Sequence, residues 1–278
     1  MTRTPDSYLA VCTIYRDDAE YLREWIEFHR LVGVERFLLY NNQSSDSHRR
    51  ILEPYAAQGL VSVEDWPHRL YPAVGQPSGG VQAFTDCVWR YRDTSRWIAF
   101  IDVDEFLFSP SNEPLTSVLR DFEAHPGVVV SRYEYGPSGH AEKPDGLVIE
   151  SYLERIAAAP ERPVLYKSVV QPARTIGCID FHRFLYRDGA AVNEHGWAVG
   201  TGTLPERSPA TAARLRINHY GTRSLEEMQA KDDLWEASGR GRPKQLFWER
   251  HRGGRAVHDD SISAYVPELR RRLAAPPG

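Results

Sequence analysis

Residues 97–105 read WIAFIDVDE, and this stretch decides the fold. Its five apolar residues are typical of a short strand buried in a sheet. Asp102 and Asp104 follow at once, and in extended chain their side chains point the same way. Two carboxylates so placed repel unless a positive group lies between them. A divalent cation with oxygen ligands fits there, and its open positions could hold a diphosphate. The alternative is that one aspartate caps the following loop.

Working outward, the first hundred residues alternate between strand and helix patterns. A helix is expected from Asp17 or Asp18 to Val32, where apolar residues recur at helical spacing before Gly33. The other expected elements are strands 8–14, 35–40, 60–64 and 97–101, and helices ending near Gln58 and spanning 81–91. This alternation predicts an α/β protein with a mostly parallel central sheet and helices on both faces. Ligands in such sheets bind beyond the carboxyl ends of the strands.

The second half is less regular. Strands are expected over 128–135, 164–171, 182–186 and 214–219, with a helix over 147–158. Ser224 and Glu227 form a capping box that opens a helix ending near Gly239. Residues 240–278 are rich in Arg and Pro. We therefore expect a single catalytic domain over 1–239, with residues 240–278 as an extension packed on its surface.

Composition excludes several classes of protein. The 278 residues carry a net charge of −4 and 41% hydrophobic residues, which excludes a disordered chain and gives nucleic acid no support as a partner. No run of 18 apolar residues predicts a membrane span, and the N-terminus lacks a signal-peptide pattern. The three cysteines form no CxxC motif. Reduced thiols in a cytoplasmic protein are therefore expected.

Two further residues are candidates from their positions alone. His219 follows the strand pattern RLRIN and could be a third metal ligand, although a lone histidine is more often structural. Imidazole suits manganese better than magnesium. Asp46 ends the loop NNQSSD. It either caps the next helix or lies where a nucleotide base or ribose would bind.

Several ordered segments together resemble glycosyltransferase family 92, a group close to family 2. They cover about residues 8–235. The segments are YRDDAEYLREWIEFH (15–29), LVGV (31–34), LYNNQSSD (39–46), WIAFIDVDEFL (97–107), YGPSGH (135–140), GLVIE (146–150) and INHYGTRS (217–224). The resemblance implies a GT-A fold, a nucleotide-sugar donor with UDP-sugars favoured, a hydroxyl acceptor and inversion at the anomeric carbon.

The resemblance also implies site residues. Asp102, Asp104 and His219 would hold Mn²⁺ or Mg²⁺ and the donor diphosphate. The donor-binding residues would be Thr13, Tyr15, Arg16, Asn41, Asp46, Asp102 and Val103. The chain departs from the family pattern at Arg16-Asp17-Asp18, where Lys-Asn-Glu is usual, at Asn41-Asn42, where Asp-Asn is usual, and at Gln171, where Arg is usual. These departures bear on the choice of base and sugar.

Inversion requires a general base that takes the proton of the acceptor hydroxyl. Glu150 is the prediction, because it follows the acceptor-like loop at an expected helix start, and Glu134 and Asp180 are its rivals. Two other functions compete with glycosyl transfer. One is a phosphohydrolase of the HAD kind, although Phe106 stands where that class often has Thr. The other is a nucleotide-sugar-binding protein without catalysis.

Overall fold

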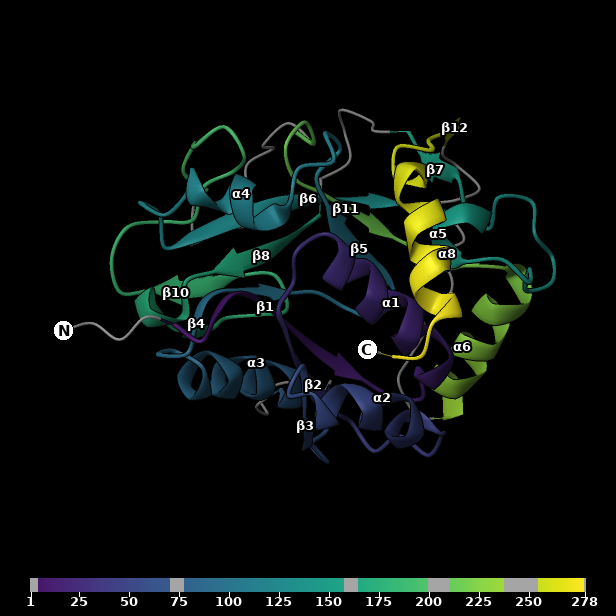
Figure 1. Cartoon of the computed structure of the whole chain (residues 1–278), viewed down its shortest axis with the longest axis horizontal. Coiled ribbons are helices and arrows are strands. Elements are labelled where there is room, and N and C mark those ends of the chain that lie inside the picture. Colours follow the sequence, from purple (N-terminus) through teal and green to yellow (C-terminus); the bar gives the residue numbers. More distant parts are fainter. Residues whose placement is uncertain (1–4, 71–77, 158–164, 200–210, 238–254, 278) are drawn as a thin grey trace.

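The computed structural model describes residues 5–70, 78–157, 165–199, 211–237 and 255–277 (Figure 1). Within them, β4 lies near the middle of a sheet with the order β3-β2-β1-β4-β8-β6-β11-β5. These strands are β1 (Ser7–Tyr15), β2 (Arg36–Asn41), β3 (Val61–Asp65), β4 (Ser95–Phe100), β5 (Glu105–Phe108), β6 (Gly127–Glu134), β8 (Tyr166–Val170) and β11 (Arg216–His219).

The sheet is parallel on one side of β4 and mixed on the other. The pairs β3–β2, β2–β1 and β1–β4 are parallel, as is β6–β11. β8 runs antiparallel to both β4 and β6, and β5 runs antiparallel to β11. Four of the seven described neighbour pairs are therefore parallel, as the sequence predicted.

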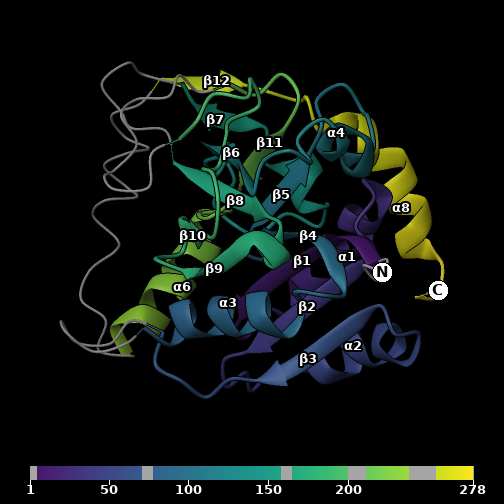
Figure 2. The ribbon, with the colours of Figure 1, turned by 90° about the vertical axis from the view of Figure 1, so that its left-hand side faces the viewer.

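Helices cover both faces of this sheet (Figures 1 and 2). Leu9 and Val11 of β1 join one apolar core with α1 (Ala19–Leu31) and α2 (His48–Ala57), whereas Ala10 and Cys12 join a second core with α3 (Gly79–Arg90). The alternation along β1 thus places successive side chains in different cores. The predicted α/β class is confirmed.

Helix α1 also fixes the chain just after the Asp-Val-Asp stretch. Trp25 Nε1 donates a hydrogen bond of 2.9 Å to the carbonyl of Glu105. The Leu107 amide donates to His29 Nε2 at 3.1 Å, so the proton of this ring sits on Nδ1, which lies 2.8 Å from the Trp25 carbonyl. Burial lowers the pKa of His29 to about 3, which keeps the ring neutral. The helix therefore holds the backbone of β5 at a defined position.

Residues 255–277 complete the described core. β12 (Ala256–His258) pairs antiparallel with β7 (Glu154–Ile156), and α8 (Val266–Ala274) packs along α1, beside which Figure 1 draws it. Leu269 of α8 is fully buried in the same core as α1. The first part of the predicted extension, residues 240–254, lies outside the described residues.

Several elements differ from the sequence predictions. The helix expected over 147–158 is wrong: α5 (Val148–Ser151) is one turn long, and β7 follows it. β7 exists because it pairs with β12, about a hundred residues later, and no local pattern signals that pairing. The short helix α4 (Leu115–Arg120) and the hairpin of β9 (Thr175–Cys178) with β10 (Phe184–Tyr186) connect the larger elements.

Three further observations concern membrane spans, the cysteines and the helix predicted after Ser224. Among the described residues, no helix combines the length and the apolar character that crossing a bilayer requires. Cys12, Cys87 and Cys178 are free thiols, the first two buried. The predicted helix opened by Ser224 and Glu227 is α6 (Leu225–Ala237), and Gly239 lies outside the described residues. Ser224 Oγ accepts from the Glu227 amide at 3.2 Å, while the Glu227 carboxylate binds the Ser224 amide at 3.0 Å.

Candidate active site at the end of the central strand

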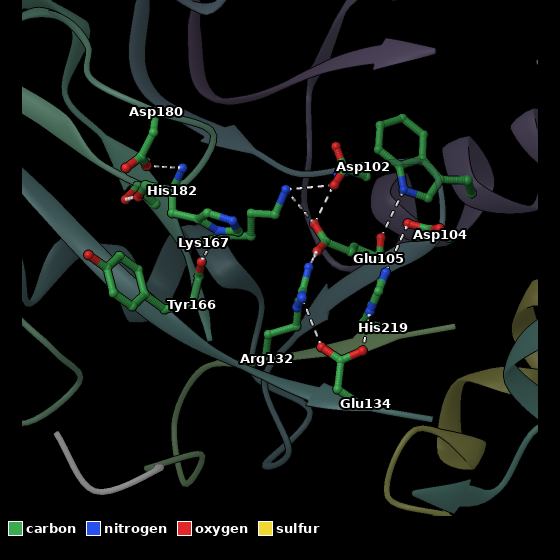
Figure 3. Close-up of polar contacts among 12 residues, drawn as sticks. Asp102, Asp104, Glu105, Arg132, Glu134, Tyr166, Lys167, Asp180, His182 and His219 are labelled. Atoms are coloured by element: carbon green, nitrogen blue, oxygen red, sulfur yellow. Dashed lines mark hydrogen bonds and ion pairs between the residues drawn. The ribbon is translucent and has the colours of Figure 1, made fainter. Parts of the chain in front are cut away.

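Asp102 and Asp104 lie in the turn that joins β4 to β5. The Glu105 amide donates to the Asp102 carbonyl at 3.0 Å, which closes the turn. Because the chain turns here, the expectation that the two aspartates point the same way is wrong. Asp102 Oδ2 lies 2.6 Å from Lys167 Nζ, whereas Asp104 Oδ1 lies 3.4 Å from His219 Nε2. The two carboxylates therefore contact different cations, as Figure 3 shows.

The two aspartates are joined by a chain of side chains whose charges alternate in sign. We call this chain the charged arc. Its members, in order of contact, are Asp102, Lys167, Glu105, Arg132, Glu134, His219, Asp104 and Lys231. They come from the β4–β5 turn and from β5, β6, β8, β11 and α6. The sheet order brings them together, because β8, β6, β11 and β5 are consecutive neighbours.

The middle of the arc is built from close ion pairs. Arg132 bridges two carboxylates, with Nη1 lying 2.8 Å from Glu105 Oε1 and Nη2 lying 2.8 Å from Glu134 Oε1. The other oxygen of Glu134 lies 2.5 Å from His219 Nδ1. Glu105 Oε2 lies 3.4 Å from Lys167 Nζ and accepts the Asp102 amide at 2.9 Å. Each buried charge thus has opposite charges beside it, as burial requires.

Burial differs along the arc. The side chains of Glu105 and Lys167 are 0% and 2% exposed, whereas Asp102 at one end is 40% exposed and Lys231 at the other is 48% exposed. The ends of the arc are therefore open to solvent and its middle is not.

The arc shifts the titration of its members. Burial lowers the pKa of His219, but the neighbouring Glu134 carboxylate, joined by Asp104, raises it to about 9. Burial raises the pKa of Asp104, but Lys231 and His219 outweigh this and hold it well below its usual range. The Lys167 ammonium likewise outweighs burial and lowers the pKa of Asp102. Both aspartates are therefore ionised at neutral pH.

Asp104 and His219 have the chemistry and spacing of a pair of metal ligands. Two ligand atoms at about 2.1 Å from an octahedral cation lie about 3 Å apart, and Asp104 Oδ1 and His219 Nε2 are 3.4 Å apart. Glu134 binds Nδ1 of the same ring, an arrangement that directs the other nitrogen toward a metal. The described residues contain no group of three or more His, Cys, Asp or Glu side chains in ligand geometry. Asp102, the third predicted ligand, faces Lys167 instead.

The predicted nucleoside-binding residues lie on and after β1 and β2. Thr13 and Tyr15 are buried on β1, and their side-chain hydroxyl groups have no hydrogen-bond partner within the described residues. Asn41 is also buried, donating to Asp65 at 2.8 Å. Arg16 is exposed, with Nε lying 3.6 Å from Asp17, and Val103 is buried in the apolar core. Thr13 and Tyr15 are therefore buried near the carboxyl end of β1.

Asp46 joins the starts of two helices. Its carboxylate accepts the Ala19 amide of α1 at 2.7 Å and the His48 amide of α2 at 3.2 Å, and it lies 2.9 Å from His48 Nδ1. Asp18 occupies the N-cap position of α1 but caps no amide with its side chain, so Asp46 supplies that cap from another loop. These contacts support the helix-capping interpretation of Asp46.

The three predicted bases are each held by a cation or an amide. Glu150 accepts the Leu147 amide at 2.8 Å and pairs with Arg270 of α8, whose Nη2 lies 2.6 Å away. Asp180 pairs with Arg183 Nη2 at 2.5 Å and lies on the Lys167 side of the arc in Figure 3. Glu134 belongs to the arc itself. The structure therefore brings Glu134, Asp104 and His219 together and places Glu150 against α8.

Sequence reasoning missed the cations of the site. Lys167 and Arg132 each lie between two carboxylates of the arc and Lys231 ends it, and none of the three was predicted as a site residue. One signal was present, since Lys167 stands within the apolar strand YKSVV, where an unpaired charge would be costly. No comparable signal marks Lys231, which is half-exposed on a helix rich in charge.

A family model and two related sequences identify one family. The family model described as glycosyltransferase family 92 matches residues 6–175. The "Glycosyltransferase family 92 protein Os08g0121900" of Oryza sativa subsp. japonica is 36% identical over 168 residues, which cover 59% of this chain and 27% of that protein. The "Glycosyltransferase family 92 protein At1g27200" of Arabidopsis thaliana is 31% identical over 237 residues, covering 80% of this chain and 36% of that protein.

A shorter match, over 38% of this chain and 22% of the relative, is 29% identical to the "Galactan beta-1,4-galactosyltransferase GALS1" of Arabidopsis thaliana. Among solved structures, S. aureus TarS 1-349 matches with a TM-score of 0.37 and 11% identity, over 60% of this chain and 47% of that chain. The chain spans about a third of the length of the family 92 relatives named above. Since the family model covers more than half of its residues, the chain belongs to glycosyltransferase family 92.

Proposed function

We propose that this chain is a metal-dependent inverting glycosyltransferase that moves a sugar from a nucleotide-sugar donor, with UDP-sugars favoured, to a hydroxyl group of a small molecule or glycan. The observation that carries the proposal is the pair of Asp104 Oδ1 and His219 Nε2, 3.4 Å apart at the carboxyl end of β4, with Glu134 bound to the other ring nitrogen. Family membership and the glycosyltransferase names of the relatives support the reaction class.

In this proposal Asp104 and His219 hold Mn²⁺ or Mg²⁺. When bound, such a cation supplies charge that neutralises the diphosphate of the donor as it leaves. His219 Nδ1 donates a hydrogen bond to Glu134, which directs Nε2 toward the cation. Because the pKa of His219 is about 9, the ring is protonated at neutral pH, and Nε2 would lose its proton when the cation binds. Lys167 holds Asp102 at the edge of the site, where this half-exposed carboxylate can meet the donor.

In an inverting reaction one carboxylate acts as the general base that removes the proton of the acceptor hydroxyl. Glu150 keeps that role in the proposal, and Asp180 and Glu134 are the alternatives. Glu150→Gln, Asp180→Asn and Glu134→Gln each remove basicity while keeping shape. The base is the residue whose variant loses about 10²–10⁴-fold in turnover while donor affinity is preserved.

The proposal is tested by incubating the protein with UDP-, GDP- and dTDP-sugars and Mn²⁺, and by measuring release of the nucleoside diphosphate. We expect release by the wild type, its loss after chelation, and a fall of about 1,000-fold or more in Asp104→Asn, since a metal site supplies several kcal/mol. Asp188→Asn is the matched control, because Asp188 forms an exposed pair with Arg174.

Two outcomes would favour the other readings of the sequence. Release of inorganic phosphate from simple phosphate esters, lost in Asp104→Asn, would favour a HAD-like phosphohydrolase. Tight binding of a nucleotide-sugar without any turnover across a panel of acceptors would favour a binding protein.

A further inference from the structure

Asp104 is shared between the proposed metal position and an ammonium group. Its Oδ2 lies 2.7 Å from Lys231 Nζ, while its Oδ1 faces His219 Nε2. A divalent cation bound by Asp104 and His219 would repel an ammonium group held at the same carboxylate. Lys231 must therefore weaken or leave its contact with Asp104 when the cation binds.

The side chain of Lys231 is free to change its contacts, unlike that of Lys167, the other lysine of the arc. It is 48% exposed and projects from the surface of α6 on a flexible side chain, whereas Lys167 is 2% exposed and bound to two carboxylates. Its second polar contact is the Gly221 carbonyl, at the limiting distance of 3.5 Å. The ammonium is hydrated on its exposed side, and the largely buried Asp104 keeps His219 beside it when Lys231 leaves, so the contact can exchange.

A second cation lies beside this position. Arg223 precedes α6 in a left-handed backbone conformation, with φ at +51°, and its guanidinium stacks 3.3 Å from the centre of the Tyr21 ring. The residue is 8% exposed, and its Nε has no hydrogen-bond partner within the described residues. Its charge interacts with both Asp104 and Lys231. A buried donor without a partner, beside a second cation, is suited to an anion.

Charge balance shows what the anion would be. A divalent cation on one carboxylate retains a single positive charge, whereas a nucleoside diphosphate bears more than one negative charge. Further cations are needed to neutralise the diphosphate, and Lys231 and Arg223 lie on the α6 side of Asp104. Neither is among the residues that the sequence predicted for the donor.

We propose that Lys231 is an exchangeable counter-ion of Asp104: it neutralises the carboxylate while no cation is bound, yields the position to the divalent cation, and then binds the diphosphate of the donor together with Arg223. This inference rests on the proposed function, since it assumes a nucleotide-sugar donor. It assigns Lys231 two opposite effects, because the same ammonium competes with the metal and attracts the nucleotide.

The test measures both effects in Lys231→Met. Mn²⁺ alone is titrated and followed by the electron paramagnetic resonance of the free ion, and UDP is titrated by calorimetry at saturating Mn²⁺. We expect Mn²⁺ alone to bind to Lys231→Met about tenfold more tightly than to the wild type. UDP should bind to the variant about 10- to 100-fold more weakly, as for loss of a charge-assisted hydrogen bond. Lys231→Arg should keep both affinities within a few-fold.

The control is Arg271→Met, because Arg271 is an exposed cation that pairs with Glu268 on α8, outside the arc. It should leave both affinities unchanged. Parallel weakening of Mn²⁺ and UDP binding in Lys231→Met would overturn the exchange, since a structural defect acts in one direction, and so would two unchanged affinities. If the wild type binds Mn²⁺ but none of UDP, GDP and dTDP, the proposed donor class fails as well. Normal nucleotide binding by the wild type with an unaltered variant overturns only the role of Lys231.

Discussion

The two ends of the charged arc use the same chemistry in different surroundings. At one end Lys167, 2% exposed, bridges Asp102 and the fully buried Glu105. At the other end Lys231, 48% exposed, contacts Asp104 beside His219. Each end pairs a lysine with one aspartate of the Asp-Val-Asp turn, at 2.6 Å and 2.7 Å respectively. Distance alone therefore does not separate a fixed cation from an exchangeable one.

The solvent exposure of the two lysines makes the difference, since Lys167 is buried and Lys231 is half-exposed. A buried ion cannot lose its partner without leaving an uncompensated charge in a medium of low polarity, so its pair is effectively permanent. The half-exposed Lys231 is hydrated in both states, and His219 still faces the largely buried Asp104 when the ammonium leaves, so this pair contributes little. The Lys167 end is thus part of the scaffold that shapes the site, and the Lys231 end can respond to ligands. The following variants test that contrast, beginning with the largest expected effect.

Lys167→Met should break the scaffold end. It leaves Glu105 and Asp102 without their ammonium partner, and removal of one member of a buried ion pair costs about 3–5 kcal/mol. The free energy of unfolding, measured by urea titration, should fall by that amount. Lys231→Met, the same substitution at the exposed end, should change it by at most about 1 kcal/mol. Equal losses in the two variants would contradict the contrast.

Glu134→Gln should weaken the metal site while leaving most of the scaffold in place. Gln keeps the size of the side chain but removes the charge that holds His219 Nδ1 at 2.5 Å. Loss of such a partner typically costs about 10- to 100-fold in metal affinity. Mn²⁺ titration of the variant measures this effect.

The control for that variant is Glu154→Gln, because Glu154 pairs with the exposed His258 on β7 and β12, outside the arc. Its Mn²⁺ affinity should equal that of the wild type. A wild-type affinity in Glu134→Gln would mean that Glu134 only neutralises Arg132.

Much of the fold could be predicted because its signals are local. The order of β1, α1, β2, α2, β3, α3 and β4 follows from apolar periodicity and from breakers such as Gly33 and Gly59. β7 could not be predicted, since it exists through its pairing with β12. A parallel βαβ unit spans only about thirty residues, so its signals lie close together in the sequence. The second half of the sheet is assembled from distant segments.

The site divides in the same way. That Asp104 and His219 lie close together could be predicted, because each ends a recognisable strand pattern. The different directions of Asp102 and Asp104 could not, since they depend on a turn closed by the Glu105 amide. Lys231 contacts a residue 127 positions away, and nothing in its helix marks it. Carboxylates at strand ends can be recognised in a sequence. The cations that neutralise them come from distant segments, and only the tertiary structure shows which ones they are.

Asp46→Ala tests whether a carboxylate outside the arc belongs to the scaffold or to the donor pocket. It removes acceptors for the Ala19 and His48 amides, and loss of a helix cap costs about 0.5–2 kcal/mol. We expect the free energy of unfolding to fall by about 1–2 kcal/mol, with UDP affinity in Mn²⁺ unchanged. Asp46→Asn, which keeps an acceptor, should recover most of the loss. A fall in UDP affinity at constant stability would instead place Asp46 in the donor pocket.

Arg270→Gln extends the comparison of buried and exposed cations to an ion pair on the protein surface. Arg270 is 61% exposed and binds both oxygens of Glu150, at 2.6 Å and 3.0 Å. These distances are shorter than several in the arc. However, solvent screens the charge, and holding the long side chain in one conformation costs entropy. The loss in unfolding free energy should therefore be about 0–1 kcal/mol, measured by the same urea titration. Glu150 still accepts the Leu147 amide in the variant, so α5 keeps its cap. A loss as large as that of Lys167→Met would show that bidentate geometry, rather than burial, decides which pairs are fixed, and the division of the arc into a fixed and an exchangeable end would have to be abandoned.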